Sequence, residues 1–159
     1  MNNLIAGPTH PEAIALFRHA IATLGHRFSV AVKDAPAGFA DYTACPGART
    51  PGQILAHMNV LVEWSTKVVT ASSERPAEAS LVWDQALHRF FTLLKAFDDA
   101  VVASNGSAIP IEKLLQGPLS DALTHVGQIT MLRRMASSPV HAESYFRADI
   151  QPGKFIAPE

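Results

Sequence analysis

The sequence predicts an all-α protein, a four-helix bundle built as a single domain over residues 1–159. Four long segments carry apolar residues at the three-and-four spacing of an amphipathic helix, and no segment of useful length alternates as a strand does. The chain is 48% hydrophobic and 17% charged, which is a globular rather than a disordered balance. Each helix must bury its apolar face against another element, so four such helices predict a bundle.

Charge and composition exclude several classes of function. The formal net charge is -1 and the sequence contains no cluster of Lys and Arg, so no nucleic-acid-binding surface is expected. No apolar run approaches the roughly 18 to 20 residues that cross a bilayer, and no signal peptide is evident. The single cysteine, Cys45, excludes an intrachain disulfide. We therefore expect a cytoplasmic protein that binds neither nucleic acid nor membrane.

The first helix is expected to begin at a capping box formed by Thr9 and Glu12 and to end before Pro36. Its apolar stripe consists of Ile14, Phe17, Ile21, Leu24 and Phe28. His19 and His26 lie roughly 120–140° around the helix from this stripe, so both are predicted to face solvent.

Residues 35–49 are rich in Pro and Gly and are predicted to form a loop. Cys45 lies in this loop without a nearby cation or helix start to activate its thiol, which disfavours a catalytic role. Thr50 and Gln53 form the capping box of the second helix, which runs to about residue 72. Its apolar stripe consists of Ile54, Met58, Leu61, Trp64 and Val68. His57 falls within this stripe, and a buried imidazole needs a polar partner.

The third helix is expected to begin at Ser80, its N-cap, and to end at Ser104, before Asn105 and Gly106. Its apolar stripe has a heptad-like spacing and consists of Trp83, Leu87, Phe90, Leu94, Phe97 and Val101. His88 lies roughly 140° away from this stripe and is predicted to be exposed.

The last long helix is predicted over Gly117 to Met135, opened by Gly117 and Pro118, with a short extra helical turn at 111–116 before it. Its apolar stripe consists of Leu119, Ala122, Leu123, Val126 and Ile129. The C-terminal tail has weaker periodicity. We expect it to pack against the bundle and to form a last helical turn or two, indicated by Tyr145, Phe146 and Ile150.

Three side chains on two of these helices form a candidate metal site. Asp121 and His125 are four residues apart, so they project from one face of the last helix, and Gln128 continues that row. Of the seven histidines, only His57 and His125 lie on apolar stripes of long helices. Two nitrogens and one oxygen would leave a coordination position open, as in catalytic sites. The alternative is a hydrogen-bonded core histidine and a local Asp–His ion pair, and the residues alone leave both interpretations open.

Three segments resemble one family, namely RTPGQILAHM, LLQGPLSDALTHVGQITMLRRM and SPVHAESYFRADI. Together they make the whole chain similar to the DinB-like (DinB/YfiT) superfamily of small bacterial helical bundles. The resemblance implies an unusual helix order, a homodimer, and a divalent ion, often Zn or Ni, held by three histidines. His57 and His125 match two of these ligands, whereas Asp121 stands where the family usually has the first histidine of an H-x-x-x-H pair. This carboxylate either shifts the metal preference toward Fe or Mn or marks a degenerate site.

The resemblance also implies a function. We expect a metal-dependent transferase, isomerase or hydrolase that acts on a small molecule, with a low-molecular-weight thiol as a candidate co-substrate and Gln128 supporting the ligands. His141 and Tyr145 follow the last helix and are expected to be ordinary surface or packing residues. The alternative function is a non-catalytic, stress-associated or partner-binding bundle whose metal site has degenerated.

Overall fold

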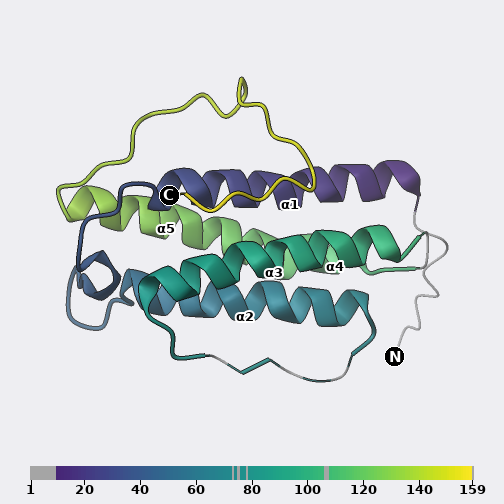
Figure 1. Ribbon diagram of the computed structural model, residues 1–159, viewed down its shortest axis with the longest axis horizontal. Helices are drawn as coiled ribbons and strands as arrows, with labels where there is room; N and C mark the ends of the chain where they lie inside the picture. The colour runs from purple at the N-terminus through teal and green to yellow at the C-terminus, as the bar shows by residue number, and fades with distance from the viewer. Residues whose placement is uncertain (1–9, 73, 75, 78, 106–107, 159) are drawn as a thin grey trace.

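Four long helices lie side by side as a bundle in the computed structural model (Figure 1). The structure describes residues 10–72, 74, 76–77, 79–105 and 108–158, and no strand occurs among them. The long helices are α1 (Pro11–Val32), α2 (Pro51–Val69), α3 (Trp83–Ala103) and α5 (Ser120–Met135). The short elements are η1 (Phe39–Asp41), α4 (Ile111–Leu114) and η2 (Leu115–Leu119). The predicted all-α class and helical bundle are therefore confirmed. Within the described residues, no helix is long and apolar enough to cross a membrane.

The helices α2 and α3 are parallel although they follow one another in the chain. Asn59 donates a hydrogen bond to the Ala86 carbonyl, and Glu63, one turn further along α2, pairs with Arg89, one turn further along α3. The described residues of the connection between α2 and α3 accordingly lie along the outside of the bundle, as Figure 1 shows. The helices α1 and α5 run in the opposite direction, so the topology is not a simple up-down-up-down bundle.

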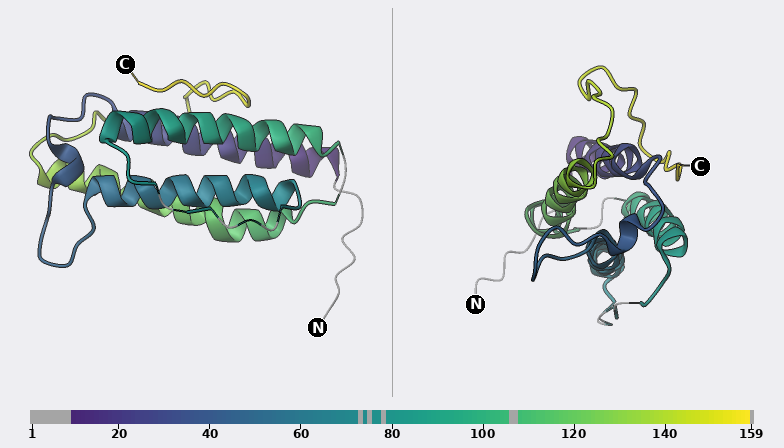
Figure 2. Two further views of the ribbon diagram at one scale, coloured as in Figure 1. Left: turned by 60° about the horizontal axis from the view of Figure 1, so that its bottom comes forward. Right: turned by 90° about the vertical axis from the view of Figure 1, so that its left-hand side faces the viewer.

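The helices α1 and α2 occupy opposite corners of the bundle. Each of them packs against both α3 and α5, and the end-on view in Figure 2 shows this diagonal arrangement. The link at 33–50, which contains η1, crosses one end of the bundle to join them. Phe39 of η1 closes this end, with its ring edge-on to Trp83 at 5.9 Å.

The core between α1 and α3 is built from phenylalanines at the predicted positions. The ring centroids of Phe28 and Phe90 lie 4.4 Å apart, and those of Phe17 and Phe97 lie 5.8 Å apart. On α2 the predicted stripe is rotated from the buried face, which contains Leu55, Met58 and Val62. Trp64 is consequently 42% exposed, which corrects the expectation that it faces the core.

Polar residues explain why the apolar pattern of α2 misled the prediction. Asn59 and Ser65 are buried, which a hydrophobic stripe does not indicate. Asn59 donates to the Ala86 carbonyl at 3.1 Å, and Ser65 donates to the Leu61 carbonyl at 2.8 Å. Because each of them makes a hydrogen bond, the two polar side chains can lie on the inner face while Trp64 remains at the surface, although Oδ1 of Asn59 is buried without a partner among the described residues.

One of the three predicted helix caps is present as expected. Thr50 accepts a hydrogen bond from the Gln53 amide, and the Thr50 amide donates to Gln53 Oε1, so the capping box of α2 is confirmed. The cap of α3 is Val82 rather than Ser80, so that helix starts later than expected. The cap of α1 is His10, without a side-chain hydrogen bond, and Thr9 lies outside the described residues.

The segment from Ile111 to Met135 is one continuous run of helical turns. Gly117 and Pro118 do not open the last helix, as the sequence had suggested, but lie within the wide turn of η2. Pro118 has no amide hydrogen to donate, so a regular α-helical ladder cannot pass through it. Instead, both the amide and the hydroxyl of Ser120 donate to the Leu115 carbonyl, which closes the wider turn.

The C-terminal tail packs across α1, but none of its described residues is helical. Phe146 is fully exposed, so the helical turns predicted around it are wrong. The tail is held instead by three contacts on α1. Glu143 lies 3.0 Å from His26, the Tyr145 ring lies 4.1 Å from the Arg27 guanidinium carbon, and Phe155 packs over Gly25. The tail therefore covers His26 in part, although a solvent-facing position had been predicted for this histidine.

Candidate metal centre

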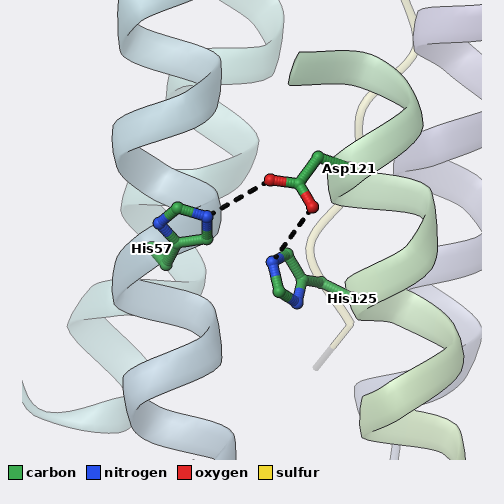
Figure 3. Close-up of side chains that lie close together, drawn as sticks. All are labelled: His57, Asp121 and His125. Atoms are coloured by element: carbon green, nitrogen blue, oxygen red, sulfur yellow. Dashed lines mark hydrogen bonds and ion pairs between the residues drawn. The ribbon is translucent and has the colours of Figure 1, made fainter. Parts of the chain in front are cut away.

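The structure brings His57, Asp121 and His125 together between α2 and α5 (Figure 3). Each residue offers one ligand atom, and these three atoms all lie within 4.8 Å of one another. The Asp121 carboxylate lies between the two imidazoles, with Oδ2 3.3 Å from His57 Nε2 and Oδ1 3.5 Å from His125 Nε2. This group could hold a metal ion.

The local fold explains how the three side chains meet. The helices α2 and α5 are antiparallel neighbours, so His57 on α2 faces two successive turns of α5. Asp121 and His125 occupy these two turns because they are four residues apart. The wide turn η2 ends two residues before Asp121 and therefore sets the direction in which the first ligand on α5 points. Wide helical turns of this kind often occur at functional sites.

The centre is closed on one side and open on the other. The His125 side chain is only 8% exposed, whereas the side chains of His57 and Asp121 are 34% and 46% exposed. His125 is thus a core residue as predicted, and Asp121 lies at the edge of the bundle. His57 is half-buried rather than enclosed in the core, because the buried face of α2 is rotated away from the predicted stripe.

Gln128 determines which nitrogen of His125 is free. The Nδ1 atom of His125 lies 2.8 Å from Gln128 Oε1, and an amide oxygen only accepts hydrogen bonds. With the Gln128 amide in this orientation, Nδ1 donates to Oε1, and in the neutral ring the Nε2 lone pair points toward Asp121. A lone pair and a carboxylate oxygen repel each other unless a proton on Nε2 or a metal ion lies between them. Metal-binding histidines are commonly oriented by such a hydrogen bond from the other ring nitrogen.

The donor set of the centre fits a divalent ion. One carboxylate and two neutral imidazoles carry a total charge of −1, and a divalent ion would change this total to +1. The two imidazole rings are edge-on, with centroids 5.0 Å apart, so they do not block each other's nitrogens. Three protein ligands and an exposed side leave at least one position for water or substrate.

A hollow of about 390 Å³ adjoins the centre, since His125 lines it, although His57 and Asp121 do not. His125 and Gln128 belong to both the centre and this hollow. The hollow is lined by Ala48, Arg49, Ile54, His125, Gln128, Met131 and Leu132. Arg49 was not identified as a site residue from the sequence, although it lies directly before the capping box of α2. Its position became evident only once the packing of α2 against α5 was known.

The remaining reactive side chains lie elsewhere. Cys45 is an exposed free thiol in the loop at 33–50, as expected. His141 lines a separate hollow between the tail and the ends of α1 and α5, and Tyr145 packs on α1. His19 and His88 are exposed, as predicted. Across the part of the chain that the structure describes, no second group of three His, Cys, Asp or Glu side chains is placed to hold a metal.

Comparisons with protein-family models, with curated proteins and with solved structures find no match to this chain. The class of protein is therefore described by the fold and by the geometry of the site alone. The protein is a helical bundle in which two consecutive long helices, α2 and α3, are parallel, with a His–Asp–His group that could hold a metal ion.

Proposed function

We propose that the protein is a metal-dependent enzyme of the DinB-like class that acts on a small molecule. His57, Asp121 and His125 would be the metal ligands. The observation that carries this proposal is the convergence of their three ligand atoms, from two helices, within 4.8 Å beside a hollow of about 390 Å³. Hollows of this size, next to a few polar groups, are typical of small-molecule sites.

The side chains of the centre have distinct roles in this proposal. His125 is buried and held by Gln128, so it presents Nε2 in a fixed direction. His57 and Asp121 are on the solvent side and leave room for an exchangeable ligand. A bound divalent ion would lower the pKa of a thiol or water that reaches it. This chemistry suits a transferase, isomerase or hydrolase, with a low-molecular-weight thiol as the co-substrate.

The ligand set bears on the identity of the metal. Two imidazoles suit Zn and Ni, which the family resemblance also favours. The Asp121 carboxylate is a harder, anionic ligand and increases the suitability of the site for Fe or Mn. We propose Zn or Ni as the ion, with Fe or Mn as the alternatives that this carboxylate makes accessible.

We also propose that the protein is a cytoplasmic homodimer. Large apolar side chains such as Leu16, Met131 and Met135 are at least half exposed, which supports association through a helix face. Sedimentation equilibrium of the purified protein tests this proposal, because a monomer at micromolar concentration would contradict it.

A second candidate function is a non-catalytic bundle whose centre is a hydrogen-bonded cluster. It is favoured by the approach of the Asp121 carboxylate to both imidazoles, which forms an ion pair if either ring is protonated. In this case the three residues would stabilise the contact between α2 and α5, and the protein would act by binding a partner.

Metal analysis of protein purified without chelator separates the two candidates. The enzyme proposal predicts about one ion per chain, restored after chelation by adding zinc, nickel, iron or manganese. A content well below one ion per chain, unchanged by any of these additions, would favour the non-catalytic bundle. Circular dichroism of the chelated protein provides the control, because the apolar core rather than the ion holds this fold together.

A further inference from the structure

We propose that Arg49 binds the carboxylate of a small substrate that lies in the hollow beside His125. This inference rests on the proposed metal-dependent function and adds the chemical class of the substrate. Arg49 ends the loop before α2, next to the Thr50 cap, so its backbone position is fixed by the start of that helix. The hollow shares His125 with the metal centre and is also lined by a cation, Arg49.

The guanidinium of Arg49 has no hydrogen bond or ion pair within the described part of the chain. Two other arginines, by contrast, are engaged within the protein: Arg18 pairs with Asp98, and Arg133 donates to backbone carbonyls of the link after α1. No Asp or Glu lines the hollow. The five donors of Arg49 are therefore available to a ligand, and they match a carboxylate in a bidentate arrangement.

The charge of the site selects an anion. The His–Asp–His group has a total charge of −1 when its imidazoles are neutral, and a divalent ion brings it to +1. Arg49 adds a second positive charge at the hollow. An anionic substrate in the hollow would then be attracted by two cationic groups, namely Arg49, which would hold its carboxylate, and the ion held by the His–Asp–His group.

The walls of the hollow define the rest of the substrate. Ile54, Met131 and Leu132 are apolar, and Met131 is 54% exposed at the rim. The volume of about 390 Å³ is at the small end of the range for ligand sites. A compact molecule with a short apolar portion and one carboxylate meets these conditions.

Hexanoate binding to the zinc-loaded and to the zinc-free protein, followed by NMR chemical shifts, tests the inference, because the zinc-free measurement isolates the contribution of Arg49 from that of the metal. We expect Arg49→Gln to weaken hexanoate binding roughly 10- to 100-fold, the loss typical of a hydrogen bond to a charged group. Arg49→Lys should retain part of the affinity. Arg134→Gln is the matched control, because it removes an exposed arginine of α5 that does not line the hollow. Circular dichroism verifies that each variant is folded.

Two further probes complete the test, namely a neutral amide and a phosphate ester of the same chain length. Hexanamide should bind equally weakly to the wild type and to Arg49→Gln, because it lacks the charge. Equal hexanoate affinity in wild type and Arg49→Gln, or no hexanoate binding at all, would overturn the inference. Tighter binding of hexyl phosphate than of hexanoate would also overturn the assignment to a carboxylate.

Zinc titration of the same proteins separates this inference from the proposed function. Zinc binding by both wild type and Arg49→Gln, without Arg49-dependent hexanoate binding, overturns only the carboxylate assignment. An absence of zinc binding overturns the metal-dependent function, and with it the role of the hollow as a substrate site.

Discussion

The Nδ1 atom of His125 lies 2.8 Å from Oε1 of Gln128, so Gln128 holds the His125 ring with Nε2 directed toward Asp121. The two residues are one turn apart on α5 and need no other element to form this contact. If the centre binds a metal, the hydrogen bond prepares one ligand before the ion arrives. The bond therefore offers a way to weaken the site without removing a ligand.

Replacing Gln128 with Leu should weaken metal binding by roughly 10- to 100-fold, as found when such supporting hydrogen bonds are lost. The side chain keeps its approximate shape but no longer accepts a hydrogen bond from Nδ1. Zinc titration of the chelated protein measures the change. Gln116→Leu, on the exposed surface of η2, is the control. Equal zinc affinity in Gln128→Leu and Gln116→Leu would contradict the role of Gln128.

Asp121 should control which metal the centre prefers. Asp121→His would replace the carboxylate with a third imidazole, and we expect it to raise the preference for zinc or nickel over manganese by about ten-fold or more. Asp121→Asn keeps an oxygen but removes the negative charge, so it should weaken binding of all these ions. Competition titrations with manganese and zinc measure the ratio. An unchanged ratio in Asp121→His would show that Asp121 is not a ligand.

Arg133 should be important for stability rather than for the metal centre. It is 3% exposed and donates to the carbonyls of Ala31, Lys33 and Asp34 at the end of α1. Burial lowers its pKa, yet the hydrogen bonds need the charged, five-donor form. Arg133→Met leaves these carbonyls without partners and should reduce the free energy of unfolding by about 2–4 kcal/mol.

Urea denaturation measures the effect of Arg133→Met. The adjacent exposed residue provides the control, since Arg134→Met should change the stability by no more than about 0.5 kcal/mol. Zinc affinity should be the same in both variants. A free energy of unfolding equal to that of the wild type would contradict the prediction. It would mean that the three carbonyls at the end of α1 find other hydrogen-bond partners, such as water.

The pair Arg18–Asp98 should make a similar contribution between α1 and α3. Both hydrogen bonds of this bidentate pair are 2.8 Å long, and Asp98 is 1% exposed. The hydrogen bonds with Asp98 raise the pKa of Arg18, so the pair remains charged. Asp98→Ala should cost about 2–3 kcal/mol, less than a fully buried pair because Arg18 can still reach water.

Thermal or urea unfolding of Asp98→Ala tests this contribution. Asp99→Ala removes the neighbouring carboxylate, which pairs with Lys95 on the exposed surface of α3, and should leave stability nearly unchanged. Similar losses in the two variants would indicate a general effect of charge rather than the specific contact with Arg18.

Predictions from the sequence were correct for elements that depend on local patterns. They were wrong where tertiary contacts determine which residues are buried or where a helix begins. The capping box of Thr50 and the phenylalanine stripes of α1 and α3 follow from spacing alone, and they were correct. Trp64 was placed in the core because a wheel of apolar residues cannot show that buried Asn59 donates a hydrogen bond to α3. The start of the last helix was missed because Pro118 normally opens a helix, whereas here a wide turn accommodates it.

The three residues of the candidate site could be predicted from the sequence, but the residues of the hollow beside them could not. His57, Asp121 and His125 could be chosen because histidines on apolar stripes are unusual and because Asp121 lies one turn before His125. Arg49 could not be chosen, since a loop arginine has no periodicity that reveals what it faces. Its relation to His125 depends on the antiparallel packing of α2 and α5, which no local pattern encodes.

The central claim is that His57 and His125 hold one divalent ion together with Asp121. Calorimetric titration of chelated protein with zinc tests it most directly, with His57→Ala, His125→Ala and the exposed His88→Ala as the control. We predict about one zinc per chain for the wild type and for His88→Ala, and no binding for the other two variants with helical content retained. Zinc binding by His125→Ala equal to that of the wild type would contradict the site.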